Sequence, residues 1–215
     1  MKTKIFCDIA DLNVIKKFNK KSIVKGFTTN PSLMRKAGAK DYELYSKKIL
    51  RVCPAKPVSL EVFADDYLNI KKQALKISTW GKNVYVKIPI TNSKGEKAFN
   101  LVKNLSMNGI KCNITAILTL NQVKEIYEIA NPDTDMVISI FAGRIADTGV
   151  DPIATMRDAI SLCKHKKKIE ILWASTREIL NIIQANNIGC HIITVPPAII
   201  EKIQRFGKSF DQLTK

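Results

Sequence analysis

Short apolar segments alternate along the chain with longer segments that place apolar residues at helical spacing. The short segments are rich in β-branched residues, which is typical of buried strands. A strand followed by a helix, repeated along the chain, indicates a parallel β/α architecture. The expected strands are Lys4–Asp8, Val24–Thr28, Pro57–Phe63, Asn83–Ile88, Lys111–Ala116, Met136–Phe141, Ile169–Ala174 and Cys190–Val195.

A helix is expected after each of these strands. Pro152 stands at the first turn of one helix, a position that proline favours, and Gly109 marks the end of another. The expected helices are a short one from about Leu12, then Tyr42–Val52, Tyr67–Ser78, Lys94–Met107, Leu120–Ala130, Asp151–Cys163, Glu178–Ala185 and Pro197–Arg205. Eight strand–helix pairs in 215 residues predict an α/β fold, a closed (β/α)8 TIM barrel, rather than an open sheet.

The composition predicts one domain, residues 1–215. Its hydrophobic content of 46% is enough for a buried core, and no change of composition marks a second domain. The last segment, Phe206–Lys215, carries Phe206, Phe210 and Leu213 at helical spacing. It is expected to form an extra C-terminal helical segment that packs on a neighbouring subunit or caps the barrel.

Polar side chains stand at the carboxyl ends of the expected strands, where a (β/α)8 barrel has its active site. Along each strand they alternate with apolar neighbours, so they share the inward face. A full ring of such residues has few structural explanations, although single ones are often caps or turn formers. The polar candidate site residues are Asp8, Thr28, Asn30, Glu61, Lys87, Asn113, Thr115, Ser139, Arg144, Ser175 and Arg177, and the apolar Phe141 joins them because it shares the face of Ser139.

Lys87 stands near the end of one strand, on the face opposite Val84 and Val86 and just before Pro89. An ammonium is costly to bury, and a neutral amine is a nucleophile toward carbonyl groups. The simpler interpretation is that the lysine extends from the strand end into water. The other strand ends decide between the two.

The net charge of +16 raises the possibility of a basic nucleic-acid-binding protein. The excess is lysine spread along the chain, and arginines are few. The one dense run, at residues 165–168, falls between a helix and a strand and is typical of a solvated loop. We therefore expect no nucleic-acid partner, while the positive field can attract phosphorylated substrates.

The cysteines and histidines do not indicate a metal centre. Five scattered cysteines without a Cys-x-x-Cys pair argue against both a disulfide framework and a zinc site, and only two histidines are present. No signal peptide or bilayer-spanning run is recognised. A cytoplasmic protein without a metal, a cofactor or a membrane partner is expected.

Several motifs together resemble those of the transaldolase family, including its short members and the related fructose-6-phosphate aldolases. The similarity covers almost the whole chain. The most specific blocks are Thr-Thr-Asn-Pro-Ser at 28–32 and Val-Lys-Ile-Pro at 86–89. The others are Phe-Cys-Asp at 6–8, Ser-Leu-Glu-Val at 59–62, Asn-Ile-Thr-Ala at 113–116, Ser-Ile-Phe-Ala-Gly-Arg-Ile at 139–145 and Ala-Ser-Thr-Arg at 174–177.

The resemblance implies a class I Schiff-base mechanism without a cofactor. Lys87 would attack the ketone of a ketose phosphate, and a water held by Glu61 and Thr115 would move protons. Asp8 would act as the base on the hydroxyl beyond the scissile bond. Substrate-binding residues would be Thr28, Asn30, Asn113, Ser139 and Phe141, with Arg144, Ser175 and Arg177 on the phosphate. For the two arginines the alternative is a surface ion pair with an acid such as Asp147 or Glu178.

Within the family, glutamate on the third strand and phenylalanine on the sixth distinguish transaldolases from the aldolases, and this chain has Glu61 and Phe141. The resemblance thus implies transfer of dihydroxyacetone from sedoheptulose 7-phosphate or fructose 6-phosphate to glyceraldehyde 3-phosphate or erythrose 4-phosphate, in the pentose phosphate pathway. The alternatives are an aldolase that releases free dihydroxyacetone, a barrel that has lost catalysis and only binds, and, more remotely and from another class, a basic nucleic-acid-binding protein. A ring-like homo-oligomer built through the terminal helices is also implied.

Overall fold

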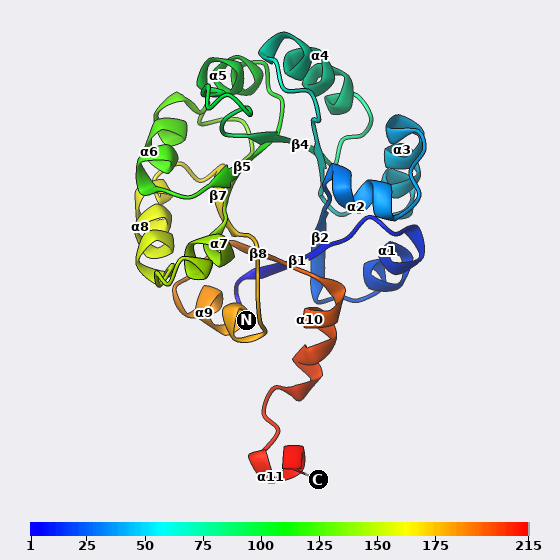
Figure 1. The fold of residues 1–215 in the computed structure, drawn as a ribbon, viewed down its shortest axis with the longest axis vertical. Helices are drawn as coiled ribbons and strands as arrows, with labels where there is room; N and C mark the ends of the chain where they lie inside the picture. The colour runs from blue at the N-terminus through cyan, green and yellow to red at the C-terminus, as the bar shows by residue number, and fades with distance from the viewer. Residues whose placement is uncertain (215) are drawn as a thin grey trace.

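The structure is a computed structural model that describes residues 1–214. Eight parallel strands form a closed barrel in chain order, and β1 pairs with β8 to close it (Figure 1). The strands are β1 (Lys4–Asp8), β2 (Val24–Thr28), β3 (Val58–Glu61), β4 (Val84–Pro89), β5 (Cys112–Ile117), β6 (Met136–Ile140), β7 (Ile169–Trp173) and β8 (Ile192–Val195). The predicted (β/α)8 TIM barrel is confirmed.

Helices surround the barrel on its outside, except for the last one, which lies away from the barrel (Figure 1). Within the described residues they are α1 (Leu12–Asn19), α2 (Pro31–Lys36), α3 (Tyr42–Val52), α4 (Tyr67–Ser78), α5 (Phe99–Met107), α6 (Leu120–Ile129), α7 (Ala142–Asp147), α8 (Ile153–Cys163), α9 (Leu180–Asn187), α10 (Pro197–Glu201), the 3-10 helix η1 (Lys202–Arg205) and α11 (Phe210–Thr214). The short helices α2 and α7 lie at carboxyl ends of strands, and neither was among the expected elements.

One predicted helix begins later than expected. The helix expected from Lys94 begins at Phe99, because the residues before it form a turn. Thr91 and Lys97 pair as an antiparallel bridge, and Asn92 N donates to Glu96 O at 3.1 Å. This turn supplies the backbone hydrogen bonds that a helix would otherwise have made.

Two apolar regions hold the barrel together. The larger one lies between the strands and the surrounding helices. The smaller one fills part of the interior with Phe6, Val137, Leu172, Ala174 and Ile192, and with Tyr85 and Phe141 packed against them. On β2, a Cβ atom at Gly26 would lie 2.6 Å from the Phe6 ring, so glycine at this position leaves room for the ring.

The C-terminal segment runs away from the barrel instead of capping it (Figure 1). Its apolar side chains face solvent in this chain, with Phe206 41%, Phe210 88% and Leu213 53% exposed. The predicted segment ended at Lys215, which lies outside the described residues. Across residues 1–214, no helix combines the length and the apolar character needed to cross a bilayer.

Candidate active site

A cavity of about 160 Å³ opens at the carboxyl ends of the strands. Every residue that lines it was predicted from the sequence, except Ala174 and Thr194. The lining residues are Asp8, Thr28, Asn30, Lys87, Thr115, Ser139, Phe141, Arg144, Ala174, Ser175 and Thr194. Three predicted residues, Glu61, Asn113 and Arg177, lie outside this lining and are described below.

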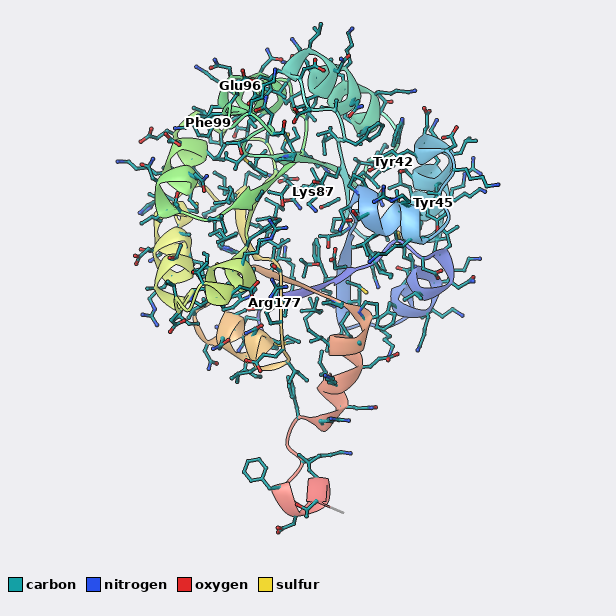
Figure 2. The ribbon with its side chains drawn as sticks, in the orientation of Figure 1. Tyr42, Tyr45, Lys87, Glu96, Phe99 and Arg177 are labelled. Carbon is teal, nitrogen blue, oxygen red and sulfur yellow. The ribbon has the colours of Figure 1, made fainter. Side chains whose placement is uncertain are left out.

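Lys87 points into the barrel from β4 and is only 9% exposed (Figure 2). Its Nζ atom lies 3.0 Å from Glu61 Oε2 and donates to the backbone oxygen of Thr29 at 3.2 Å. The simpler interpretation of the sequence, that the lysine extends into bulk water, is therefore wrong. A buried lysine held by an acid and a carbonyl beside a cavity is placed to meet a small ligand.

Glu61 stands beside Lys87 on the neighbouring strand, because the two residues are register partners of β3 and β4. Tyr42 on α3 donates its hydroxyl to the Glu61 backbone oxygen at 2.8 Å and so fixes the strand end (Figure 2). The Oε2 atom of Glu61 contacts Lys87 as an ion pair, without the alignment of a hydrogen bond.

Two buried oxygen atoms near Lys87 have no hydrogen-bond partner within residues 1–214: Glu61 Oε2 and Thr115 Oγ1. They come from the strands on either side of β4. Buried polar atoms are nearly always hydrogen-bonded in folded proteins, so two oxygen atoms that accept no hydrogen bond beside a cavity, one of them in an ion pair only, indicate a site for a ligand group or a bound water.

Asp8 lies at the end of β1, across the barrel from Lys87, and is partly exposed to the cavity. Thr28 donates its hydroxyl to Asp8 Oδ1 at 2.7 Å. Burial raises the pKa of Asp8, while the Thr28 hydrogen bond and the positive charge of Lys87 act in the opposite direction. Asp8 is therefore a carboxyl group with an increased tendency to take up a proton.

Amide and hydroxyl groups line the side of the cavity between β2 and β6. Asn30 caps α2 by accepting a hydrogen bond from Leu33 N at 2.9 Å, which fixes its side chain at the cavity wall. Asn113 is fully buried; it donates to Ser59 Oγ at 2.9 Å and accepts from Ser139 Oγ at 2.7 Å. Asn113 therefore lies behind the cavity and orients Ser139.

Phe141 and Arg144 form the next part of the wall. The Arg144 guanidinium carbon lies 4.6 Å from the centre of the Phe141 ring. Gly143 brings α7 close to the β7 loop, since a Cβ atom there would lie 1.6 Å from the Ser175 oxygen. Only glycine allows this approach, which places Arg144 and Ser175 on one cavity wall.

Arg177 does not line the cavity. Its Nε atom donates to Asp147 Oδ1 at 3.0 Å, and its Nη2 atom contacts the other carboxylate oxygen. Both side chains are about half exposed, at 48% for Arg177 and 52% for Asp147. The hydrogen bonds from Arg177 hold the pKa of Asp147 below its ordinary value. In this structure Arg177 thus makes the surface ion pair that the sequence left open as an alternative.

Backbone strain is concentrated beside the cavity. Within residues 1–214, the residues other than glycine that have a positive φ are Ala116, at 62°, and Ser175, at 63°. Ala116 follows Thr115, and Ser175 itself lines the cavity. Left-handed conformations cost energy for residues with a side chain and are common at functional sites.

Two lining residues were missed from the sequence. Thr194 is the one hydroxyl residue of the expected strand Cys190–Val195, and its position on the same face as Ile192 at the carboxyl end could have identified it. Ala174 carries no polar group, so no chemical signal pointed to it. Thr194 Oγ1 lies 2.6 Å from Thr28 Oγ1 and belongs to the Asp8 side of the cavity.

Comparison with known proteins gives a family for this sequence. A family model described as Transaldolase/Fructose-6-phosphate aldolase matches residues 5–215. A protein of Nitrosopumilus maritimus named "probable transaldolase" is 36% identical over 204 residues, which cover 93% of this chain and 86% of that protein. A "probable transaldolase" of Dehalococcoides mccartyi is 33% identical over 203 residues, covering 94% of this chain and 90% of that protein.

Comparison with solved structures agrees on the fold. The structure of a protein assigned to the dihydrodipicolinate synthase family from Coccidioides immitis superimposes with a TM-score of 0.66. The match covers 99% of this chain and 75% of that chain at 12% identity. Similarity at this level of identity concerns the barrel fold alone.

Proposed function

The chain belongs to the transaldolase/fructose-6-phosphate aldolase family, and from this premise we propose that it transfers a dihydroxyacetone unit between sugar phosphates through a Schiff base on Lys87. The observation that carries the proposal is the buried contact of 3.0 Å between Lys87 Nζ and Glu61 Oε2 beside the cavity. An amine enclosed with an acid can form and dehydrate a carbinolamine.

The first step joins Lys87 to the ketone carbon of the donor. Glu61 takes the proton of the Lys87 ammonium, and the neutral amine then adds to the carbonyl carbon while one N–H proton passes to the carbonyl oxygen. The resulting carbinolamine takes up one proton and loses its hydroxyl as water, which leaves a protonated imine. This loss needs a proton donor at the hydroxyl. Glu61 Oε2 and Thr115 Oγ1, the two buried oxygen atoms that accept no hydrogen bond, are suited to hold a water that delivers the proton.

The second step breaks the carbon–carbon bond. Asp8 accepts the proton of the hydroxyl beyond the scissile bond, and the O–H electron pair forms the new aldehyde. The electrons of the broken bond pass to the imine nitrogen, so a neutral enamine remains on Lys87. A carboxyl with a raised pKa is a stronger base when ionised, and this supports Asp8 in the role.

The fate of the enamine decides between transferase and aldolase. Phe141 lines the cavity and has no proton to donate, which favours capture of the enamine by an acceptor aldehyde over protonation and release. We therefore propose transaldolase activity. The alternative, an aldolase that releases free dihydroxyacetone, differs from it in this step alone.

The substrate is proposed to bind along the polar wall. Asn30 and Ser139, the latter oriented by Asn113, are suited to the hydroxyls of the three-carbon unit. Arg144 and Ser175 are suited to the phosphate group. Arg177 would join them by exchanging Asp147 for the phosphate.

The proposed donors are sedoheptulose 7-phosphate and fructose 6-phosphate, and the proposed acceptors are glyceraldehyde 3-phosphate and erythrose 4-phosphate. The proposed pathway is the pentose phosphate pathway, and the proposed location of the protein is the cytoplasm. A ring-like homo-oligomer is also proposed, because the exposed side chains of Phe206, Phe210 and Leu213 lie on a segment that leaves its own barrel.

A product assay tests the function. The protein is incubated with fructose 6-phosphate, with and without erythrose 4-phosphate, and the products are separated. The expected result is sedoheptulose 7-phosphate when the acceptor is present, little free dihydroxyacetone when it is absent, and neither product with Lys87→Met. Free dihydroxyacetone as the main product in both reactions would favour the aldolase.

A further inference from the structure

Three side chains on three adjacent strands form a chain of hydrogen bonds at the cavity wall. Thr28 Oγ1 donates to Asp8 Oδ1 at 2.7 Å and lies 2.6 Å from Thr194 Oγ1. In the closed barrel β1 lies between β8 and β2, so the two threonines come from the strands on either side of Asp8. Thr194 has no part in the reaction steps proposed above.

The direction of this chain follows from the number of protons. A hydroxyl group has one proton to donate, and an ionised carboxylate has none. Because Thr28 gives its proton to Asp8, the contact of 2.6 Å is a hydrogen bond only when Thr194 is the donor. Hydrogen bonds in such a chain polarise and strengthen one another, and the bond that ends on a carboxylate is the strongest.

Thr194 is firmly held in its position. It is 7% exposed, and its backbone oxygen accepts a hydrogen bond from Thr176 Oγ1 at 2.8 Å. It is the register partner of Phe6 on β1, one pleat below Asp8. The other residues of β8 are apolar, so this hydroxyl is an exception on a buried strand.

We propose that Thr194 is a positioning residue for Asp8. The Thr194 hydroxyl donates a hydrogen bond to Thr28 Oγ1, so that the Thr28 hydroxyl donates its own proton to the Asp8 carboxylate. This hydrogen bond keeps Asp8 ionised and oriented to accept a proton from the substrate. The inference rests on the proposed function, in which Asp8 is the base. Without the Thr194 hydroxyl, Thr28 is free to turn its proton toward other acceptors.

The expected consequence is a change in pH dependence. Burial raises the pKa of Asp8, and the Thr28 hydrogen bond is a cause that lowers it. Weakening this bond raises the pKa further, so the base becomes ionised only at higher pH. The other charged groups around the cavity, which stay in place, are Lys87, Arg144 and Glu61.

The test compares two variants of one position. Thr194→Val keeps the shape and removes the hydroxyl, and Thr194→Ser keeps the hydroxyl. Thr3→Val is the matched control, because Thr3 is also buried and donates its hydroxyl to Cys190 O at 2.7 Å, at the opposite end of the barrel. For each protein, kcat/KM for the cleavage of fructose 6-phosphate is measured against pH, and the borohydride-trapped adduct on Lys87 is quantified.

Thr194→Val is expected to lose about tenfold in kcat/KM at neutral pH, which corresponds to one hydrogen bond. In the pH profile of kcat/KM, the rise on the acidic side is expected to move to higher pH for Thr194→Val. For Thr194→Ser and Thr3→Val this acidic limb is expected to stay at the wild-type pH. Adduct formation on Lys87 stays at the wild-type level. Should Thr194→Val fail to fold, Thr194→Cys replaces it, since a thiol is a weak donor, with a limb shift in the same direction.

The outcomes separate the two levels of the proposal. An unshifted acidic limb in a folded variant, with adduct still forming on Lys87, overturns the role of Thr194 alone. A wild-type protein that forms no adduct on Lys87 overturns the proposed function as well. If Thr194→Ser loses as much activity as Thr194→Val, the hydroxyl is not what matters, and this position serves packing only.

Discussion

Lys87 Nζ lies 3.0 Å from Glu61 Oε2, and the two residues are register partners on adjacent strands of the barrel, β4 and β3. Their side chains are only 11% and 15% exposed, so solvent screens this contact far less than it screens the other lysine pairs of the surface. Because the two residues are directly opposite each other in the strand pairing, the Glu61 carboxylate lies beside the Lys87 amine. An acid at this distance can exchange protons with any group that forms on the amine.

Glu61→Gln tests the acid directly. We expect kcat for transfer to fall by about a hundredfold or more, the usual contribution of general acid–base catalysis, because the amide cannot deliver a proton to the departing hydroxyl. Steady-state kinetics and circular dichroism are the measurements. Glu125→Gln is the matched control, since Glu125 pairs with Lys97 at 2.9 Å on the outer surface. Equal losses in both variants would contradict a catalytic role for Glu61.

Phe141→Tyr tests the choice between transfer and release. The new hydroxyl would stand in the cavity wall and help to protonate the enamine, so we expect free dihydroxyacetone from fructose 6-phosphate to rise severalfold. Phe99→Tyr is the control, because Phe99 also lies under a cation, with Lys97 Nζ 5.1 Å from its ring centre, but on an outer helix. No increase over this control would remove Phe141 as the explanation.

Asp147→Asn tests whether Arg177 is available to the substrate phosphate. Because Asp147 now holds the guanidinium, its neutralisation should lower KM for a phosphorylated donor by up to about fivefold, a modest effect because exposed ion pairs are weak. We expect kcat to change little. Glu178→Gln, at a neighbouring acid without an ion pair in residues 1–214, should leave KM as it is. An increase in KM for Asp147→Asn would mean that the pair positions the arginine usefully.

Asp8→Asn tests how much folding stability is lost by burying the ionised Asp8 carboxylate. Burial raises the pKa of Asp8 in the folded state above the unfolded value of about 3.9. The stability that the protonated carboxyl contributes is therefore complete below that value and is lost as pH rises through the folded-state pKa. We expect Asp8→Asn to melt at a higher temperature than the wild type at pH 7, with the difference shrinking toward pH 4. A variant less stable at pH 7 would contradict this sign.

Phe210→Asp tests the proposed assembly. Phe210 is 88% exposed on α11, and burial of such a side chain against a second copy is worth about 1.5–3 kcal/mol. A charge at this position should therefore lower the mass measured by light scattering, while Phe210→Leu should keep it. An unchanged mass in both variants would show that assembly, if present, uses another surface.

The repeating pattern of strands was readable from the sequence because a buried strand needs a continuous apolar segment. The ends of the strands were readable for the same reason, since Asp8, Glu61 and Lys87 interrupt that pattern at the point where the barrel opens. The start of the helix at Phe99 was not predictable from the sequence. It depends on the bridge between Thr91 and Lys97, and a single bridged pair does not change the spacing of apolar residues along the chain.

The rim of the site depends on contacts distant in sequence. The pairing of Arg177 with Asp147 requires α7 to approach the β7 loop, and a single glycine, Gly143, permits that approach. Hydrophobic periodicity does not record such a requirement. The α2 helix carried a readable signal, since Asn30 and Pro31 are a favoured cap and first residue of a helix.

The most direct test of the central claim is to trap the covalent intermediate. The protein is treated with borohydride in the presence of fructose 6-phosphate, digested, and mapped by mass spectrometry. We predict one modified peptide, which carries the reduced sugar adduct on Lys87. No modification is expected when fructose 6-phosphate is left out, or in the Lys87→Met variant. An adduct on another lysine, with Lys87 unmodified, would contradict the account.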